Sequence, residues 1–235
     1  MRGRVIALGL CAALCLSAAG CSTAQSQNSR HNAGLYVQGV LDETYSGEPD
    51  EAYLTLTGRT GEDAQAAFSG NLQAEYDQRL CVRFELEDQY VPRALRQDFL
   101  ELLDQVYRKA GYAVKSATPL EDGRYCVELS VTPVTFFSAA YSDGYDQLRR
   151  DFEDDSGYLT VEELDALEPI DARKARQERE AAWAQAVYDY LFLRLDNITT
   201  GSAVTKLVLV SPDSQGLYSL PTTDLQDVDD LILQY

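Results

Sequence analysis

The sequence predicts an α+β fold in which two β-hairpins form one antiparallel sheet packed against several helices. Three observations lead to this prediction. Apolar residues recur every three or four positions through most of residues 35–106 and 136–195, which is the period of a helix. The period changes to two in Tyr112–Val131 and again after residue 204. Each alternating stretch also contains a turn, so we expect hairpins with helices packed on their apolar face.

Four helices are expected before the first hairpin. The first carries Leu35, Val37, Val40 and Leu41 at helical spacing and ends at the Ser46-Gly47 break. A short second helix fits Pro49–Leu56, with proline near its first turn. The third has an apolar residue at every fourth position: Ala64, Phe68, Leu72, Tyr76 and Leu80. The fourth opens at Pro92, carries one apolar stripe and stops before Gly111.

The first hairpin turns at Glu121-Asp122-Gly123, and its second strand places Tyr125, Val127, Leu129 and Val131 on one face. Residues 136–195 are then predicted to be helical, with interruptions near Ser156-Gly157 and at Pro169.

The second hairpin begins with Val204–Val210, which is apolar enough for a central strand. It turns at Pro212–Gly216 and returns through Leu217–Leu220. We expect Thr223 and Gln226 to form the capping box of a last helix.

The N-terminus has the features of a secretory signal. Arg2 and Arg4 precede the apolar segment Val5–Leu16, which is too short to be a membrane-spanning helix. The sequence Ala18-Ala19-Gly20-Cys21 resembles the lipobox of bacterial lipoproteins, although that family prefers leucine where Ala18 stands. The resemblance implies that Cys21 is acylated and becomes the first residue of the mature chain.

The domain organisation follows from the expected cleavage site before Cys21. We expect a signal peptide at residues 1–20, a lipidated cysteine and flexible tether at 21–32, and a single α+β domain at 33–235. Lipid on Cys21 would hold the protein at the extracytoplasmic face of the cell membrane. The alternative is ordinary cleavage after Ala19, which would release a secreted protein.

Charge restricts the partners. The chain carries a formal charge of −18, and removal of residues 1–20 takes away two arginines and brings it to −20. Such a surface repels phosphate groups, so we expect no nucleic-acid partner and a membrane contact made through the lipid.

Five features together resemble the surface lipoproteins of Gram-positive bacteria that carry a domain of unknown function. They are Cys21, the helical opening Tyr36–Gly58, the acid- and alanine-rich helix after it, the hairpin Tyr112–Val131, and the closing Gly216–Leu225. The resemblance covers nearly all of the mature chain. It implies a location and a fold class, and no site residues.

The sequence offers little for catalysis. Its single histidine, His31, lies in the expected tether, and no nucleotide-binding or serine-hydrolase motif is present. We therefore expect no enzyme, catalytic residue, metal or cofactor. Phe152–Glu163 resembles a calcium loop but has phenylalanine at its first ligand position. A helix start with Thr160 and Glu163 as a capping box explains the same residues without a metal.

Tyrosine suits ligand stacking and protein interfaces, and the chain has 15 tyrosines. Tyr141, Tyr145 and Tyr158 lie in a less apolar stretch and are the candidates for an exposed ligand-binding cluster. Cys81 and Cys126 would close a disulfide in an oxidising compartment or remain separate, partly buried thiols.

We thus expect a non-enzymatic lipoprotein that binds an unidentified glycan, peptide or protein partner outside the membrane. The alternatives are a structural lipoprotein that docks on a membrane complex, and a carboxylate-based hydrolase.

Overall fold

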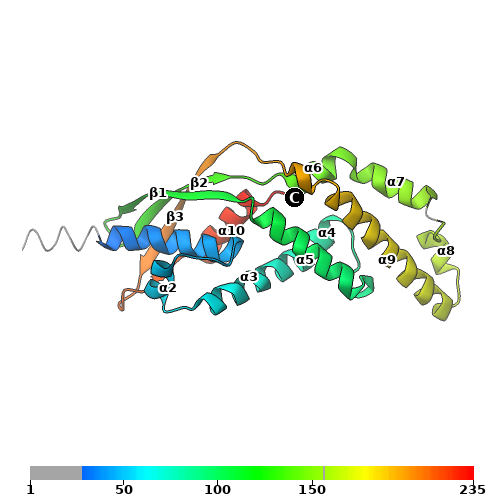
Figure 1. The fold of residues 1–235 in the computed structure, drawn as a ribbon, viewed down its shortest axis with the longest axis horizontal. Coiled ribbons are helices and arrows are strands. Elements are labelled where there is room, and N and C mark those ends of the chain that lie inside the picture. Colours follow the sequence, from blue (N-terminus) through cyan, green and yellow to red (C-terminus); the bar gives the residue numbers. More distant parts are fainter. Residues whose placement is uncertain (1–27, 156) are drawn as a thin grey trace, which may run out of the picture.

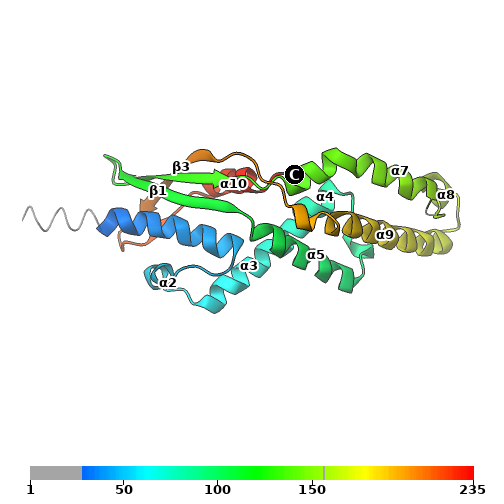
Figure 2. The same ribbon diagram turned by 45° about the horizontal axis from the view of Figure 1, so that its top comes forward.

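The computed structural model describes residues 28–155 and 157–235, which form an elongated molecule (Figure 1). The sheet and the first described helix, residues 28–45, lie at one end, and the helices of residues 146–192 lie at the other (Figures 1 and 2). The predicted signal peptide, Cys21 and residues 21–27 of the tether lie outside the described residues. None of the described helices combines the length and apolar character that crossing a membrane requires.

One antiparallel sheet contains both predicted hairpins. Its strands are β1 (Gly111–Pro119), β2 (Tyr125–Thr132), β3 (Val204–Pro212) and β4 (Tyr218–Ser219), paired in chain order. Tyr112 lies opposite Val131, and Val127 lies opposite Val208, so the apolar residues of the three long strands share one face. The predicted fold class is confirmed.

Two helices cover this face. Residues 28–45 pack against β1, where Tyr45 contacts the ring of Tyr112. Helix α10 (Thr222–Ile232) lies under β2 and β3. Side chains from both helices also bond to sheet edges: Gln38 accepts from the Val114 amide at 3.1 Å, and Asp224 accepts from the Leu209 amide at 2.8 Å. These bonds satisfy donors that an edge strand would leave free.

The helices between residue 46 and the sheet follow the predicted apolar stripes. They are α2 (Glu51–Thr57), α3 (Gly61–Glu75), α4 (Cys81–Arg83) and α5 (Arg93–Tyr107). A π-helical turn, Tyr76–Leu80, joins α3 to α4. A spacing of four residues is longer than one α-helical turn, which takes 3.6 residues. It is shorter than one turn of a π helix, whose hydrogen bonds join residues i and i+5. The wider turn therefore keeps the last members of the four-residue repeat, Tyr76 and Leu80, on the buried side.

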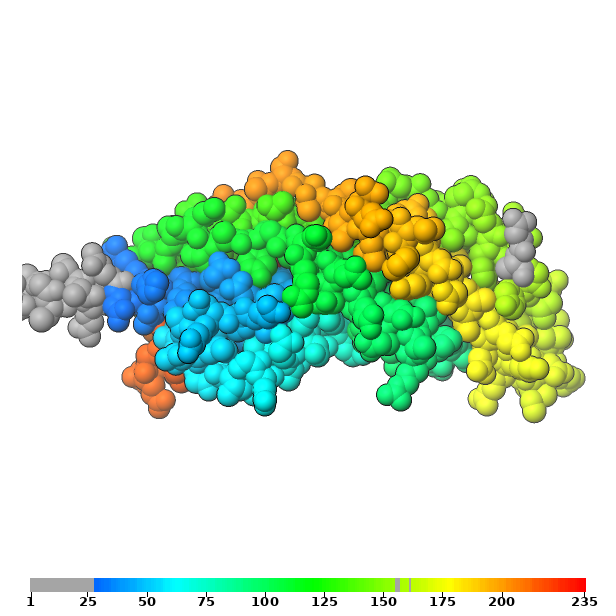
Figure 3. Space-filling model, viewed as in Figure 1, coloured from blue at the N-terminus to red at the C-terminus, as the bar shows by residue number. Residues whose placement is uncertain are grey.

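The far end of the molecule is built from α6 (Phe136–Ala140), a second π turn (Tyr141–Tyr145), α7 (Asp146–Asp155), α8 (Val161–Asp165) and α9 (Pro169–Phe192). Trp183 of α9 donates from Nε1 to the Phe84 carbonyl at 3.1 Å, which ties α9 to the end of α4. Residues near 160–175 form the extreme of the surface opposite the first helix (Figure 3). The predicted interruption at Pro169 is where α9 begins.

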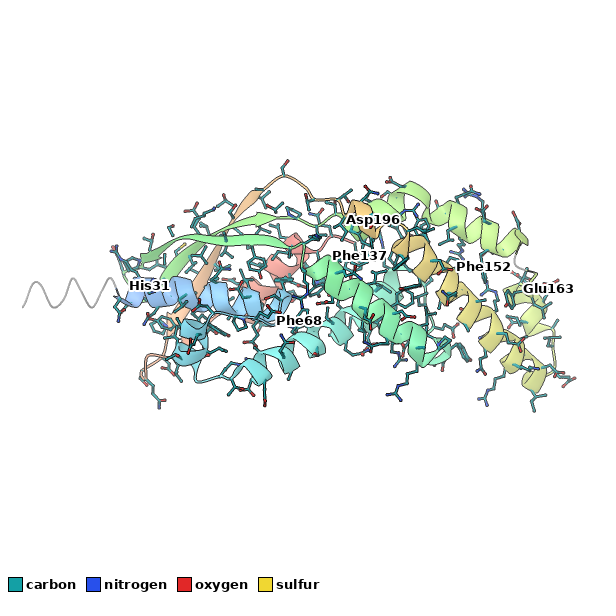
Figure 4. All side chains as sticks on the ribbon, viewed as in Figure 1. His31, Phe68, Phe137, Phe152, Glu163 and Asp196 are labelled. Carbon is teal, nitrogen blue, oxygen red and sulfur yellow. The ribbon has the colours of Figure 1, made fainter. Side chains whose placement is uncertain are left out.

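Two boundary predictions are wrong. Residues 28–32, expected in the tether, are helical and carry His31 on the exposed surface (Figure 4). Their helix continues into the buried positions Ala33, Val37 and Leu41, so packing further along stabilises its start. The expected Thr223–Gln226 capping box does not form, because α10 begins two residues earlier, with Pro221 at its N-cap position.

Close packing between the first helix and α2 depends on Gly39. A Cβ atom at this position would lie 2.1 Å from Cγ and Cδ2 of Tyr53, which is 3% exposed. We expect Gly39→Ala to reduce the free energy of unfolding by about 1–3 kcal/mol, because the Tyr53 ring must move within a packed core. Urea unfolding measures the change.

Gly70→Ala is the matched control, because Gly70 also lies in a helix but a Cβ atom added there would meet no other atom within 4 Å. It should stabilise the protein by about 0.4–1 kcal/mol. Equal stability of Gly39→Ala and the wild type would contradict this packing of α2 on the first helix.

Candidate functional site

A cavity of about 300 Å³ opens where the first helix, α3, α5 and α10 meet. Its walls combine apolar and polar groups. Ala74, Leu225 and the buried Tyr107 contribute carbon surface. Hydroxyl and amide groups come from Thr44, Asn71, Gln78, Thr222 and Gln226. The charged residues are Glu75, Arg79 and Asp229. We call this the Glu75 cavity.

The π turn after α3 positions two charged residues of the cavity, Glu75 and Arg79. Glu75 is the last residue of α3, and Arg79 lies within the π turn that follows, so both side chains reach the same cavity. Single π turns inside α-helices are uncommon and are often found at functional sites. This turn is therefore a structural reason to examine the cavity, independent of the residue types that line it.

Arg79 connects α3 to α10. Its Nη2 donates to Asp229 Oδ2 at 2.7 Å and to Asp230 Oδ1 at 2.6 Å. The other oxygen of Asp229 accepts from the Tyr45 hydroxyl at 2.7 Å. Burial alone lowers the pKa of Arg79, but the nearby carboxylates, Glu75 first among them, outweigh it and raise that pKa. Arg79 therefore keeps its charge in the wall of the cavity.

Glu75 is the most buried charged group at the site. Its side chain is 6% exposed, and Oε2 lies 3.7 Å from Arg79 Nε. The hydroxyls of Tyr235 and Tyr107 also interact with this carboxylate by hydrogen bonding. Burial raises the pKa of Glu75, and Asp229 adds to that shift, while the Tyr235 hydroxyl and the Arg79 guanidinium oppose it.

Three tyrosines surround the two carboxylates. Burial raises the pKa of Tyr45, Tyr107 and Tyr235, and the negative charges of Glu75 and Asp229 raise it further. These phenols keep their protons at neutral pH and act as hydrogen-bond donors. The cavity thus combines apolar walls with neutral donors and charged groups, which can orient a polar ligand.

Comparisons with known proteins concern the fold. No family model matches the sequence, and no curated protein sequence matches it significantly. The crystal structure of a putative lipoprotein (ycdA) from Bacillus subtilis subsp. subtilis str. 168 matches the arrangement with a TM-score of 0.55. The two proteins share a fold. They are 11% identical, and the match covers 91% of this chain and 59% of that chain. This chain therefore spans less than two thirds of the length of its structural neighbour.

The predicted tyrosine cluster does not form an exposed surface. Tyr145 is 1% exposed and stacks on Tyr141 with ring centroids 4.6 Å apart. Tyr141 is half-buried under the guanidinium of Arg83. Tyr158 is exposed and stacks on Phe152, which itself packs on Trp183. The π turn at Tyr141–Tyr145 buries the ring of Tyr145 and leaves the ring of Tyr141 half-buried. Helical periodicity in the sequence does not reveal this turn.

The two described cysteines are free thiols, and the calcium-like loop ends in a capped helix start. Cys81 is buried and Cys126 half-buried. Burial raises the pKa of Cys81 to about 11, so this thiol stays protonated at neutral pH. Thr160 and Glu163 form the capping box that the sequence analysis offered as the alternative to calcium. Phe152, at the expected first ligand position, packs against Trp183.

Sequence analysis did not identify the Glu75 cavity. Glu75, Arg79 and Asp229 are ordinary surface residue types among 38 acidic and 20 basic side chains. One signal in the sequence was the position of Glu75 directly before Tyr76 in the buried four-residue repeat, which places a carboxylate close to the core.

The raised pKa of Glu75 implies a pH dependence of stability. The folded state binds its proton more tightly than the unfolded chain does, so this contribution is complete below the ordinary pKa of 4.5. It is lost as the pH rises through the raised value. We therefore expect Glu75→Gln, which stays neutral, to become more stable relative to the wild type between acidic and neutral pH.

Urea unfolding of both proteins at several pH values measures this difference, because the remaining titrating groups are common to both. Asp77→Asn is the control: Asp77 is exposed, follows Glu75 by two residues and does not line the cavity. A stability difference between Glu75→Gln and the wild type that does not change with pH would contradict the predicted shift.

Proposed function

We propose that this protein is a lipid-anchored, extracytoplasmic binding protein that holds a ligand or a segment of a partner in the Glu75 cavity. The observation that carries the proposal is a cavity of about 300 Å³ beside a π turn, lined by apolar surface and by the charged side chains of Glu75, Arg79 and Asp229. Apolar walls with a few convergent polar groups are typical of ligand sites.

The anchor rests on the sequence. Cys21 follows a short apolar segment and a run of small residues, as in lipoprotein signal sequences. The fold shared with a putative lipoprotein is consistent with this address. The mature chain would carry its lipid seven residues before residue 28, where the described first helix begins. A fully extended chain of that length spans at most about 25 Å, so the end with the sheet would stay near the membrane.

A binding role fits the cavity better than a hydrolytic one. The two carboxylates that face it, Glu75 and Asp229, share Arg79, and Asp229 also accepts from Tyr45. Asp229 thus has fixed partners on both oxygens, which leaves it poorly placed as a nucleophile or a base. We therefore propose a protein without catalytic activity at this site.

Docking on a membrane complex is the second candidate function. The exposed apolar side chains Tyr158, Leu159, Leu167 and Ile170 lie close together in sequence at the far end of the molecule. Ile170 is 79% exposed. If this surface docks on a membrane complex, replacing Leu167 and Ile170 by serine would abolish cross-linking of the protein to that complex on intact cells. It should leave ligand binding at the distant Glu75 cavity unchanged.

The lipid anchor is tested by fractionation. Cys21→Ser removes the thiol that would be acylated, so we expect the variant to move from the membrane fraction to the soluble extracytoplasmic fraction. Cys126→Ser is the control, because Cys126 lies within the sheet and should leave the protein in membranes. Retention of Cys21→Ser with membranes would contradict lipid anchoring.

The cavity is tested by ligand-induced stabilisation. A glycan, cell-wall fragment or peptide present at 100 times its dissociation constant should stabilise the protein by about 2.7 kcal/mol. This corresponds to an increase in melting temperature on the order of 5–10 °C. We expect Ala74→Phe, which fills the cavity with a larger apolar side chain, to remove that increase.

Ala66→Phe is the matched control, because Ala66 lies on the same helix but is exposed and outside the cavity. An increase that persists in Ala74→Phe would place the ligand elsewhere and contradict the proposed site.

A further inference from the structure

We infer that the outer edge of β3 is a docking site for an extended segment of a partner protein, which would add to the sheet as a further strand. The segment would carry an apolar side chain opposite Leu207 and no net negative charge. No residue of β3 lines the Glu75 cavity, so the inference does not depend on the proposed function.

The backbone of β3 shows which of its groups face this edge. The Leu209 amide donates to Asp224 Oδ2 at 2.8 Å, so it points away from β2. The direction of the backbone groups alternates along a strand, and β2 and β3 pair without a register shift. The N–H and C=O groups of Thr205 and Leu207 therefore point to the same outer edge as those of Leu209.

Part of this edge has no partner within the described chain. β4 pairs with the last two residues of β3, and Asp224 accepts from the Leu209 amide. No other described residue bonds to the outward N–H and C=O groups of Thr205 and Leu207, and both residues are exposed. Unpaired backbone groups along an edge strand are a template for another strand, and only an extended backbone matches their spacing.

The side chains at this edge are apolar and exposed. Leu207 is 58% exposed and Val204 is 40% exposed. The buried side chain of Val208 points to the helices, so the side chain of Leu207 lies on the opposite face of the sheet. A strand added here would place one of its own side chains directly beside Leu207. An apolar side chain at that place would remove both groups from water.

The other edge of the sheet is protected, and the comparison singles out β3. Strand β1 has a register shift between Val114 and Ser116, ends at Pro119 and donates its Val114 amide to Gln38 of the first helix. Bulges, proline and a covering helix are devices by which natural sheets prevent strand addition. Residues 204–208 of β3 contain no proline and no register shift. The edge of β3 can therefore accept a strand, whereas the edge of β1 cannot.

A second copy of the chain fits this edge poorly. Antiparallel pairing of two identical β3 edges gives a twofold axis normal to the sheet. This axis reverses the long axis of the molecule, because β1 and the first helix run along that long axis (Figures 1 and 2). With the proposed lipid anchors, the two tethers would then point in opposite directions, away from a common membrane. The formal charge of −18 on each copy adds repulsion and favours a segment without net negative charge.

The test measures amide hydrogen exchange by NMR on the full chain in detergent. The probe is an acetylated and amidated peptide, KVTVTVK, which alternates apolar and polar side chains. In the free protein, we expect the amides of Thr205 and Leu207 to exchange rapidly and those of Lys206 and Val208, which face β2, to exchange slowly. The peptide should slow exchange at Thr205 and Leu207 by about ten-fold. Unchanged exchange at both amides would overturn the inference.

Two N-methylated peptides test whether backbone pairing carries the binding. N-methylation of two valines blocks N–H groups that would face β3, because the valine side chains would lie on the same face as Leu207. N-methylation of the two threonines blocks N–H groups that would face away from β3. The first peptide should lose its protection of Thr205 and Leu207, and the second should keep it. Equal behaviour of the two peptides would overturn strand addition.

A proline variant tests the edge from the side of the protein. Leu207→Pro removes an outward N–H group and no bond to β2, so we expect the sheet to form and the affinity for the peptide to fall about ten-fold. Leu217→Ser is the control, because Leu217 is 49% exposed but lies between β3 and β4, away from residues 204–208. Unchanged affinity in Leu207→Pro would overturn the inference. The exchange measurement on the wild type decides the matter if this variant does not fold.

Two further outcomes separate this inference from its alternatives. Protection of Thr205 and Leu207 that rises with protein concentration, without peptide, would mean that a second copy occupies the edge, and would overturn the partner segment. Ala74→Phe should leave binding of the peptide unchanged. Loss of binding in Ala74→Phe would place the peptide in the Glu75 cavity, which would overturn docking at β3 and support the proposed function. Peptide binding at β3 with no ligand in the cavity would support this inference and contradict that function.

Discussion

Burial of one face of β2 is the constraint on which the rest of the structure depends. Val127, Leu129 and Val131 on this strand are fully buried, as are Val208 and Val210 on its neighbour β3. Antiparallel pairing places these side chains on one surface, and the free energy of removing them from water requires a helical cover. The first helix and α10 supply it, although they come from opposite ends of the described chain.

The polar cavity is a consequence of that cover. Once α10 and the first helix lie on the same sheet face, Asp229 and Tyr45 meet beside α3 and α5, at the edge of the apolar core. Arg79 then bonds across 150 positions in sequence to Asp229. The arrangement stabilises the junction between helices and holds the buried Glu75 3.7 Å from Arg79 Nε. Packing of the core and the charged wall of the cavity are thus parts of one arrangement.

The two π turns show why sequence patterns located the fold and missed the site. Local periodicity predicted the third helix correctly, since all five members of its four-residue repeat are buried. It could not show that the helix widens at Tyr76–Leu80, because an α-helix and a π turn both keep residues four apart on nearly the same side. The second π turn, Tyr141–Tyr145, contains two tyrosines that were predicted to be exposed. Tyr145 is buried in the core, and Tyr141 is half-buried and stacks on it.

Features that depend on near neighbours along the chain could be predicted from the sequence alone. These are the two hairpins, the helix breaks at Gly157 and Pro169, and the Thr160–Glu163 cap. Hydrophobic period and turn chemistry act over a few residues, so a single sequence contains them. Which three of 38 acidic residues surround Arg79 emerges only in the folded protein, because Coulomb energy and desolvation depend on distance and burial in space. The sequence sets the charges, and the fold decides which of them pair.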